Sequence, residues 1–149
     1  MSKIPISARP SLATAVALLQ GSELPTEDLT ESHLEHFFAA GPPESLVGLV
    51  GLELCGGVAL LRSLAVDPRA RTTGMGSQLV AHAEAYARAR SIASIYLLTT
   101  TAEAFFAARG YARTDRTTAP QSIQTTREFS SLCPTSSAFM VKHLQESRK

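Results

Sequence analysis

The chain has 149 residues, of which 44% are hydrophobic and 18% charged, and its formal net charge is +1. This length suits one compact domain with a hydrophobic core, and the near-neutral charge argues against broad electrostatic binding to nucleic acid. The sequence has two cysteines, no Cys-x-x-Cys pair, no Cys/His cluster and no apolar run of membrane-spanning length. We therefore expect a cytoplasmic protein with reduced thiols, no metal and no membrane partner.

The N-terminal part of the chain predicts a short strand followed by two helices. The strand is expected over residues 4–9, and Ser11 is placed as the N-cap of the first helix. The apolar residues that share one face of this helix are Leu12, Val16 and Leu19. The polar segment 23–37 is expected to hold a loop and a short second helix.

Two apolar runs, over residues 45–54 and 58–66, predict neighbouring strands. Gly56 and Gly57 lie between them and supply the positive φ angles of a tight hairpin, so the two strands are expected to be antiparallel. The second run is almost continuously apolar, which is typical of a strand covered on both faces.

An amphipathic helix is expected after the second run and ends near Arg90. Its apolar residues are Leu79, Val80, Ala83, Tyr86 and Ala87. A buried strand follows over residues 91–100. Thr100 and Glu103 then have the spacing of a capping box, which predicts a helix over residues 102–109.

Gly110 stands where the C-cap glycine of that helix belongs. A strand over residues 110–115, a helix beginning near 118–120 and a closing strand over 138–144 complete the pattern. The expected order is β-α-α-β-β-β-α-β-α-β-α-β. This order predicts a single α/β (α+β mixed) domain over residues 1–149, with a mixed sheet and helices on both faces.

The segment between Val66 and Ser77 has the pattern of an anion-binding loop. A strand ends there, the chain turns through Gly74 and Gly76, and a helix begins whose N-terminal N–H groups and dipole favour negative charge. Two common phosphate loops do not fit, because no lysine follows the glycines and position 79 is leucine. The remaining pattern is Arg71-x-x-Gly-x-Gly, and an ordinary strand-loop-helix joint is the alternative.

This pattern, with Val66-x-Pro68 ahead of it, resembles the acetyl-CoA loop of the GCN5-related N-acetyltransferase (GNAT) superfamily, R/Q-x-x-G-x-G/A. Thr72 departs from it, because many members have glycine there. Residues 95–111 resemble a second motif of the superfamily, a strand and a short helix with an aromatic pair followed by Gly-aromatic. The resemblance covers residues 45–112 and, by element order, the whole chain. It implies a GNAT-like mixed sheet that is mostly antiparallel.

The resemblance also implies acetyl-CoA as the co-substrate. The pyrophosphate would lie on backbone amides from Arg71 to Ser77, and the pantetheine arm would pair with the strand end from Leu64 to Val66. The N–H near Leu64 would polarise the thioester carbonyl as an oxyanion-type donor. The cofactor-binding residues implied are Leu64, Ala65, Val66, Arg71, Thr72, Thr73, Gly74, Met75, Gly76, Ser77 and Phe106.

Proton transfer is where the sequence departs from the superfamily. Many members have tyrosine as the second residue of the aromatic pair, where its hydroxyl protonates the departing thiolate, but Phe106 has no such proton. Glu53 is the candidate general base for an ammonium acceptor, and Leu64 is counted as catalytic through its N–H. A surface turn residue or an ion pair with Arg62 are the alternatives for Glu53. Packed or solvated roles are expected for three weaker candidates, Tyr96, His33 and His36.

Three segments, residues 60–66, 96–106 and 125–144, narrow the resemblance to the arsenic-resistance N-acetyltransferase branch. This branch suggests a pocket for a polar, anionic acceptor, since arginine and hydroxyl donors bind carboxylates or arsenic oxyacids. The substrate-binding residues implied are Arg62, Thr99, Thr100, Thr101 and Arg127. Thr100 and Arg127 also have structural alternatives, as a helix cap and as a solvated surface residue.

The sequence therefore predicts an N-acetyltransferase that moves an acetyl group from acetyl-CoA to the amine of a small polar acceptor, with an amino-acid-like arsenical as the first candidate. Positioning of the two substrates and polarisation of one carbonyl would supply most of the rate. Alternatives are a catalytically weak acyl-CoA-binding regulatory module, favoured by Phe106, and an acetyltransferase for a drug amine or a protein N-terminus. Homodimers are common in the superfamily, and the sequence is compatible with one.

Overall fold

The computed structural model describes residues 6–8, 10–21, 26, 29–30, 32–42, 46–70, 74–126, 129–130 and 137–144. Its strands are β1 Ile6–Ala8, β2 Phe37–Ala40, β3 Gly48–Cys55, β4 Val58–Val66, β5 Ser94–Thr99, β6 Ala112–Arg113 and β7 Ala138–His143. Its α-helices are α1 Leu12–Gly21, α2 Met75–Ala89, α3 Glu103–Ala107 and α4 Gln121–Gln124. Its 3-10 helices are η1 His33–His36, η2 Pro68–Ala70 and η3 Arg116–Thr118.

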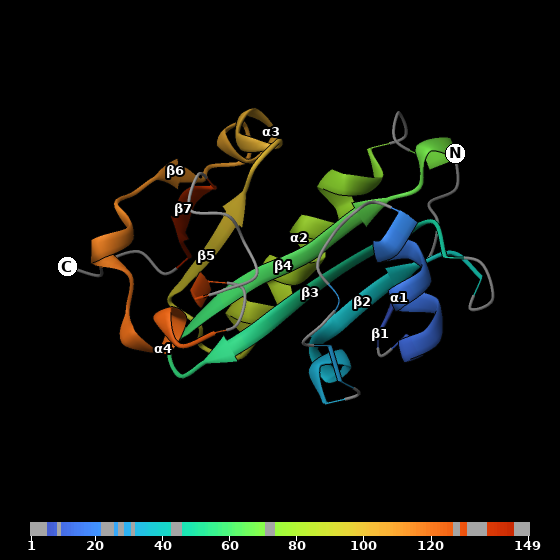
Figure 1. Ribbon diagram of the computed structural model, residues 1–149, viewed down its shortest axis with the longest axis horizontal. Helices are drawn as coiled ribbons and strands as arrows, with labels where there is room; N and C mark the ends of the chain where they lie inside the picture. The colour runs from blue at the N-terminus through green and yellow to red at the C-terminus, as the bar shows by residue number, and fades with distance from the viewer. Residues whose placement is uncertain are drawn as a thin grey trace. The chain divides into compact units, whose positions relative to one another are not determined.

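The seven strands lie in one sheet with the order β1-β2-β3-β4-β5-β7-β6 (Figure 1). Four of the strand pairs, β1/β2, β2/β3, β5/β7 and β6/β7, are antiparallel, whereas β4/β5 is parallel. The tip of the hairpin between β3 and β4 is formed by Gly56 and Gly57, and Gly56 has φ +74°. The mixed, mostly antiparallel sheet and the place of the hairpin are therefore as predicted, but the positive φ predicted for Gly57 is wrong.

The order of strands and α-helices is also as predicted, but no residue range was predicted for β2, η2 and η3 are additional, and one helix differs in type. The expected second helix is the 3-10 helix η1, which is one turn long. Ser11 caps α1 as expected, because its Oγ accepts a hydrogen bond from the N–H of Thr14 at 3.3 Å. Gly110 follows α3 with φ +98°, the angle expected of a glycine at the end of a helix.

The capping box predicted for Thr100 and Glu103 is wrong. Helix α3 begins at Glu103 with Ala102 as its N-cap, and no side chain among the described residues accepts a capping hydrogen bond there. Instead, Oγ1 of Thr99 accepts a hydrogen bond from the N–H of Ala102 at 3.0 Å. Thr100 is exposed. The hydroxyl that shapes the start of α3 therefore comes from the neighbouring threonine.

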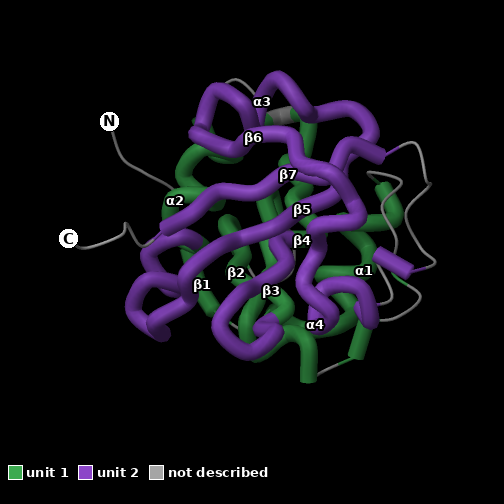
Figure 2. Tube along the Cα trace, turned by 90° about the vertical axis from the view of Figure 1, so that its left-hand side faces the viewer, with its two compact units in different colours: residues 1–53, 62–83 green, residues 54–61, 84–149 purple. Residues whose placement is uncertain are grey.

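The chain divides into two compact units, coloured separately in Figure 2. Unit 1 consists of residues 1–53 and 62–83, and unit 2 consists of residues 54–61 and 84–149. Among the described residues, none of the helices combines the length and the apolar character needed to cross a bilayer.

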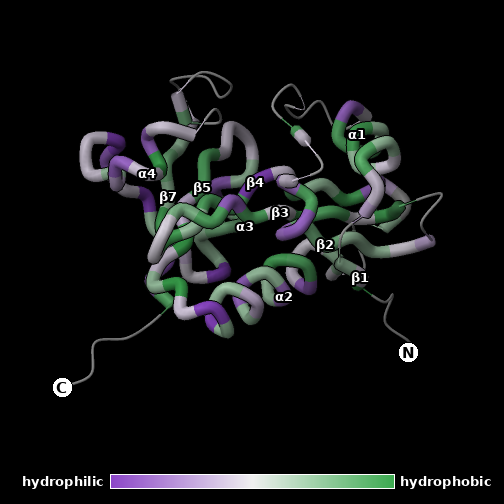
Figure 3. The backbone as a smooth tube through the Cα atoms, turned by 90° about the horizontal axis from the view of Figure 1, so that it is seen from below, coloured by the Kyte–Doolittle hydropathy of each residue, from purple (hydrophilic) through white to green (hydrophobic). Residues whose placement is uncertain are grey.

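In unit 1, helices cover both faces of β2 and β3, as predicted. Phe37 and Leu49 share a hydrophobic cluster with Leu19 of α1, whereas Phe38 lies edge-on to the ring of His82 in α2, with 4.6 Å between ring centroids. Successive side chains of a strand point to opposite faces of the sheet, so α1 and α2 lie on opposite faces. Figure 3 shows β2 and β3 as mostly hydrophobic, which explains why both faces need cover.

In unit 2, α4 covers one face of the strands. Ile123 of α4 packs in a cluster with Leu60 of β4 and Phe139 of β7. The ring of Tyr96 in β5 stacks on that of Phe139 with 5.4 Å between centroids. Tyr96 therefore has the packed role expected for it.

Candidate functional site

Strand β4 is irregular in its second half. Residues 58–61 pair in parallel with residues 94–97 of β5, while β4 itself continues to Val66. Ser63, two residues beyond this pairing, has φ 61°. A positive φ in a non-glycine residue is a strained conformation that costs roughly 1–3 kcal/mol, and inside a strand it interrupts the pleat as a β-bulge does. The interruption immediately precedes the segment predicted to pair with pantetheine.

Backbone hydrogen bonds anchor the chain where β4 ends. The N–H of Asp67 donates to the carbonyl of Val47, and the N–H of Ala70 donates to the carbonyl of Asp67, both at 2.8 Å. Within the predicted pantetheine segment, Ala65 is buried and its two neighbours are half-buried. The strand end is therefore fixed to the residue that precedes β3, and η2 leads from it toward the predicted loop.

Gly74 opens α2 in a conformation that favours glycine. Its φ is +81°, and its carbonyl accepts the N–H of Gln78 at 3.0 Å. No atom lies within 4 Å of the place where a Cβ would stand. The surrounding space would therefore accept a side chain, and glycine is favoured only by the backbone angle. The first three residues of α2 are Met75, Gly76 and Ser77. The predicted loop residues that lie outside the described ones are Arg71, Thr72 and Thr73.

Helix α2 packs closely on β3 at its first two turns. A Cβ at Gly48 would lie 2.8 Å from Cδ1 of Leu79 and 3.1 Å from Cγ of Met75. Both side chains are buried, at 0% and 2% exposure. The missing side chain at position 48 therefore lets the N-terminal end of α2, the positive end of its dipole, lie against the sheet of unit 1.

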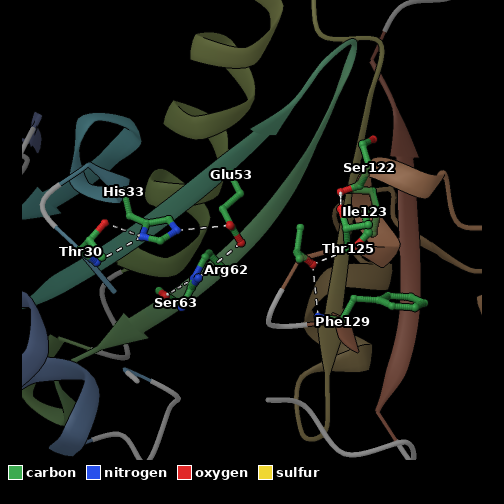
Figure 4. Close-up of polar contacts among 10 residues, drawn as sticks. Thr30, His33, Glu53, Arg62, Ser63, Ser122, Ile123, Thr125 and Phe129 are labelled. Atoms are coloured by element: carbon green, nitrogen blue, oxygen red, sulfur yellow. Dashed lines mark hydrogen bonds and ion pairs between the residues drawn. The ribbon is translucent and has the colours of Figure 1, made fainter. Parts of the chain in front are cut away.

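A chain of polar contacts links β3, β4 and η1 in unit 1 (Figure 4). Nη1 of Arg62 donates to Oε1 of Glu53 at 3.4 Å, and Nε of Arg62 donates to Oγ of Ser63 at 3.1 Å. The other carboxylate oxygen of Glu53, Oε2, lies 3.4 Å from Nε2 of His33. The ion pair considered as an alternative for Glu53 is therefore present, and it connects to the irregular residue of β4.

Burial distinguishes the two charges of this ion pair. The side chain of Arg62 is 0% exposed and that of Glu53 is 17% exposed. The guanidinium thus lies under the surface, where it neutralises a partly exposed carboxylate. Sequence patterns gave no sign that this arginine is buried, because strand position alone does not distinguish a buried arginine from an exposed one.

Phe106 lies in the core of unit 2. It is 4% exposed, and its ring makes edge-to-face contacts with Phe105 at 5.1 Å and with Tyr111 at 5.5 Å between centroids. The guanidinium carbon of Arg109 lies 3.8 Å from the centroid of the Phe105 ring. The aromatic pair of the second motif therefore has an inner and an outer member, and Phe106 is the inner one.

A buried carboxylate joins three elements of unit 2. Oε2 of Glu84 in α2 accepts a hydrogen bond from the hydroxyl of Tyr111 at 3.1 Å, and Oε1 accepts one from Nζ of Lys142 in β7 at 3.0 Å. Nζ also donates to the carbonyl of Arg109 at 2.9 Å. Burial, and then the neighbouring Glu84 carboxylate, raise the pKa of Tyr111 well above its ordinary value. This cluster is not part of the predicted site, and it anchors the turn after α3.

The predicted acceptor residues of unit 2 lie at the end of β5. Thr99 is half-buried and pairs with Ala138 of β7, while Thr100 and Thr101 are exposed in the connection to α3. Arg127 lies outside the described residues. Three successive hydroxyls are therefore presented where β5 ends, one of them engaged with the backbone of Ala102.

Unit 2 also contains an open cavity of about 540 Å³, lined by Arg113, Thr114, Asp115, Arg116, Ser137, Ala138 and Phe139. None of the predicted site residues lines it, and Nε of Arg113 already donates to Glu103 at 3.0 Å.

Within the part of the chain that the structure describes, no group of three or more His, Cys, Asp or Glu side chains is arranged to hold a metal ion.

These features define a mixed α/β fold in which an irregular strand leads to a helix preceded by a positive-φ glycine. Residues 11–113 match the family described as Acetyltransferase (GNAT) family. The match covers more than half of the chain, so the protein belongs to this acetyltransferase family. The expected superfamily is thereby confirmed. No curated protein matches the chain in sequence.

Several solved structures share the fold. N-acetylglutamate synthase from Neisseria gonorrhoeae, complexed with coenzyme A and N-acetyl-glutamate, has a TM-score of 0.82 and 21% identity over 98% of this chain and 36% of its own. Rv2747 from Mycobacterium tuberculosis, in complex with CoA and NLQ, has a TM-score of 0.74 and 19% identity over 95% of this chain and 99% of its own. A GNAT acetyltransferase from Staphylococcus aureus Mu50 has a TM-score of 0.75 and 19% identity over 96% of this chain and 100% of its own.

These identities are low, so the similarities concern the fold. The chain spans about a third of the length of the two N-acetylglutamate synthase chains, 36% and 34%. By contrast, it spans nearly the whole length of the two smaller proteins. The mixed sheet with its flanking helices is thus an arrangement that the GNAT fold uses both alone and within larger chains.

Proposed function

We propose that this protein is an acetyl-CoA-dependent N-acetyltransferase that acts on the primary amine of a small polar acceptor. The observation that carries this proposal is the combination of an irregular β4 and a positive-φ glycine at the start of α2, within a chain of the GNAT family. Coenzyme A in the structures of similar fold supports acetyl-CoA as the co-substrate.

In this proposal, the backbone carries most of the cofactor contacts. Amides from Arg71 to Ser77 hold the pyrophosphate at the positive end of α2. Residues 64–66 follow the strained Ser63 and pair with the pantetheine arm as an added strand. The N–H of Leu64 polarises the thioester carbonyl and stabilises the charge that develops on its oxygen.

Glu53 is the proposed general base, and Arg62 acts through it. The acceptor ammonium gives one proton to the carboxylate, directly or through water, and the neutral amine attacks the thioester carbonyl. The C–S bond then breaks, the nitrogen loses its second proton, and the thiolate of CoA takes up a proton. Because Phe106 has no hydroxyl, the proposed source of that proton is water or the nitrogen itself.

The proposed acceptor has a carboxylate or another oxyacid group in addition to its amine. Thr99, Thr100 and Thr101 at the end of β5, with Arg127, are the proposed donors to that anion. N-acetyl-glutamate in one structure of similar fold supports an amino-acid-like acceptor. The resemblance to the arsenic-resistance branch makes an amino-acid-like arsenical the first acceptor to test, and a cytoplasmic location would suit that role.

The test is a thermal-shift titration with acetyl-CoA, followed by thiol-release assays with a panel of amines. A ligand that binds only the native state raises the melting temperature by mass action. The panel contains amino acids, an amino-acid-like arsenical, a drug amine and a peptide with a free N-terminus. We expect a shift with acetyl-CoA and thiol release with an amino-acid-like acceptor.

Two other outcomes would change the assignment. A shift without thiol release on any amine favours the acyl-CoA-binding regulatory module, for which the missing hydroxyl at Phe106 is the supporting observation. No shift at millimolar acetyl-CoA contradicts cofactor binding and makes the start of α2 an ordinary strand-helix joint.

A further inference from the structure

We propose that His33 is a positioning residue that orients the carboxylate of Glu53 for proton transfer. This inference rests on the proposed function, in which Glu53 is the base. His33 belongs to η1, just before β2, and its Nε2 lies 3.4 Å from Oε2 of Glu53 in β3 (Figure 4). The sequence favoured a packed or solvated role for this histidine, because nothing in its local pattern indicates a contact with β3.

Each carboxylate oxygen of Glu53 lies near a nitrogen atom of a described residue. Arg62 donates to Oε1 from β4, and His33 contacts Oε2 from η1, both at 3.4 Å. The terminal torsion of a glutamate side chain has broad, weakly defined minima. In this proposal, contacts from two different elements restrict this torsion more than the contact with Arg62 does by itself.

The ring of His33 has a defined tautomer. The backbone N–H of Thr30 donates to Nδ1 at 3.2 Å, and Oγ1 of the same residue lies 3.1 Å from Nδ1. A backbone N–H is only ever a donor, so Nδ1 is the acceptor and carries no proton. The proton of the neutral ring is therefore on Nε2, the nitrogen that faces Glu53. Thr30 thus fixes both the direction of the ring and the proton that it presents.

Exposure places Glu53 at the reachable end of this network. Its side chain is 17% exposed and that of His33 is 24% exposed, while the side chain of Arg62 is 0% exposed. An acceptor ammonium can therefore approach the carboxylate but not the guanidinium. The proton then moves from nitrogen to a carboxylate oxygen whose plane the two partners have already set. The neutral amine formed in this step is the nucleophile.

Three substitutions at position 33 separate this role from simple packing. His33→Ala removes the contact with Glu53. His33→Gln keeps an N–H donor near the place of Nε2, whereas His33→Asn keeps an amide that is one methylene too short to reach. Glu53→Gln supplies the background in which the proposed base is absent. Melting temperatures of all variants show which of them remain folded.

The experiment measures the dissociation constant of acetyl-CoA, and kcat with the acceptor that the amine panel identifies. We expect His33→Ala to lower kcat roughly 10- to 100-fold, as misplacement of a reacting group does, with unchanged acetyl-CoA binding. We expect His33→Gln to recover most of kcat and His33→Asn to recover little. In the Glu53→Gln background, His33→Ala should change kcat less than about twofold, because the two residues act as one unit.

Three results would overturn the inference. An unchanged kcat in folded His33→Ala shows that Glu53 needs no second partner. An equal loss of kcat in both backgrounds shows that His33 acts independently of Glu53. A wild-type protein that binds acetyl-CoA but acetylates no amine removes the proposed function and this role with it. In that third case, the ¹⁵N shifts of the His33 ring in the wild type and Glu53→Gln still show whether the contact is structural.

Discussion

The ring of Phe37 lies directly over the backbone of Gly51, its cross-strand partner in the β2–β3 pair. A Cβ at position 51 would lie 2.3 Å from both Cε1 and Cζ of the ring. The ring is fully buried and packs in the cluster that α1 covers. The close approach of β2, β3 and α1 thus depends on one missing side chain.

Gly51→Ala is expected to destabilise the protein by roughly 1–3 kcal/mol, the usual cost of overpacking a core. The Phe37 ring has no exposed surface toward which it can move easily, so β2 or α1 must shift. Denaturant unfolding of the purified variant measures the loss. Gly57→Ala is the matched control, because no atom lies within 4 Å of a Cβ at that position. Equal stability of the two variants would show that the ring moves aside without cost.

Gly74→Ala is expected to weaken acetyl-CoA binding more than it weakens the fold. Position 74 has φ +81°, and a left-handed alanine costs roughly 1–2 kcal/mol. Gly56→Ala is the control, since Gly56 has φ +74° and equally open surroundings, but lies at the β3–β4 hairpin. Both variants should lose similar stability in thermal melts. Only the Gly74 variant should lose affinity for acetyl-CoA. Equal affinities of the two variants for acetyl-CoA would contradict the proposed cofactor loop.

Phe106→Tyr is expected to lower stability by roughly 1–3 kcal/mol, because it adds a hydroxyl to a buried ring without supplying a hydrogen-bond partner for it. We expect kcat to be no higher than in the wild type. Phe105→Tyr is the comparison, since Phe105 is half-buried. Melting temperatures and kcat of both variants are measured together. A Phe106→Tyr protein with wild-type stability and a higher kcat would show instead that this hydroxyl reaches the departing thiol.

Burial of Tyr111, and then its contact with the Glu84 carboxylate, is expected to make stability fall in alkaline solution. The folded-state pKa of Tyr111 is raised above its ordinary value of 10.0. Above pH 10 the unfolded chain therefore binds fewer protons than the native one, and the free energy of unfolding decreases as pH rises, by about 1.4 kcal/mol per pH unit from this group. Below that pH its contribution is fully present.

Urea unfolding of the wild type and Tyr111→Phe at several pH values between about 8 and 11 tests this. The variant should be less stable at neutral pH, because Glu84 loses one partner, and its stability should depend less steeply on alkaline pH. The other tyrosines, Tyr86 and Tyr96, are present in both proteins and cancel in the comparison. Parallel curves for the two proteins would show that Tyr111 ionises freely in the native state.

Local patterns predicted the parts of the protein that depend on local backbone geometry. Glycines at Gly56, Gly74 and Gly110 have the positive φ angles that their turns need, and the N-cap at Ser11 follows from its own side chain. Hydrophobic spacing gave the element order. These features involve residues close in sequence, whose preferences survive in the folded chain.

Sequence patterns missed two kinds of feature. One depends on which of two adjacent, chemically identical residues makes a contact, and the other depends on contacts between segments distant in sequence. Thr99 and Thr100 have the same chemistry, so a spacing rule selected Thr100 although Thr99 binds the N–H of Ala102. The burial of Arg62 and the contact between His33 and Glu53 arise only when η1, β3 and β4 come together. No local pattern encodes a contact between segments so far apart in the chain.

The division of the chain has a consequence for how this protein can be altered. The tip of the β3–β4 hairpin, residues 54–61, belongs to unit 2, while residues on either side of it belong to unit 1. Neither unit is a continuous stretch of sequence, so no single truncation isolates one of them as a gene fragment. To keep each unit intact, recombination with a related gene must exchange both units together or place its crossovers within β3, β4 or α2, where the unit boundaries lie. Crossovers placed in exposed loops, the usual choice for shuffling, would therefore always divide a unit.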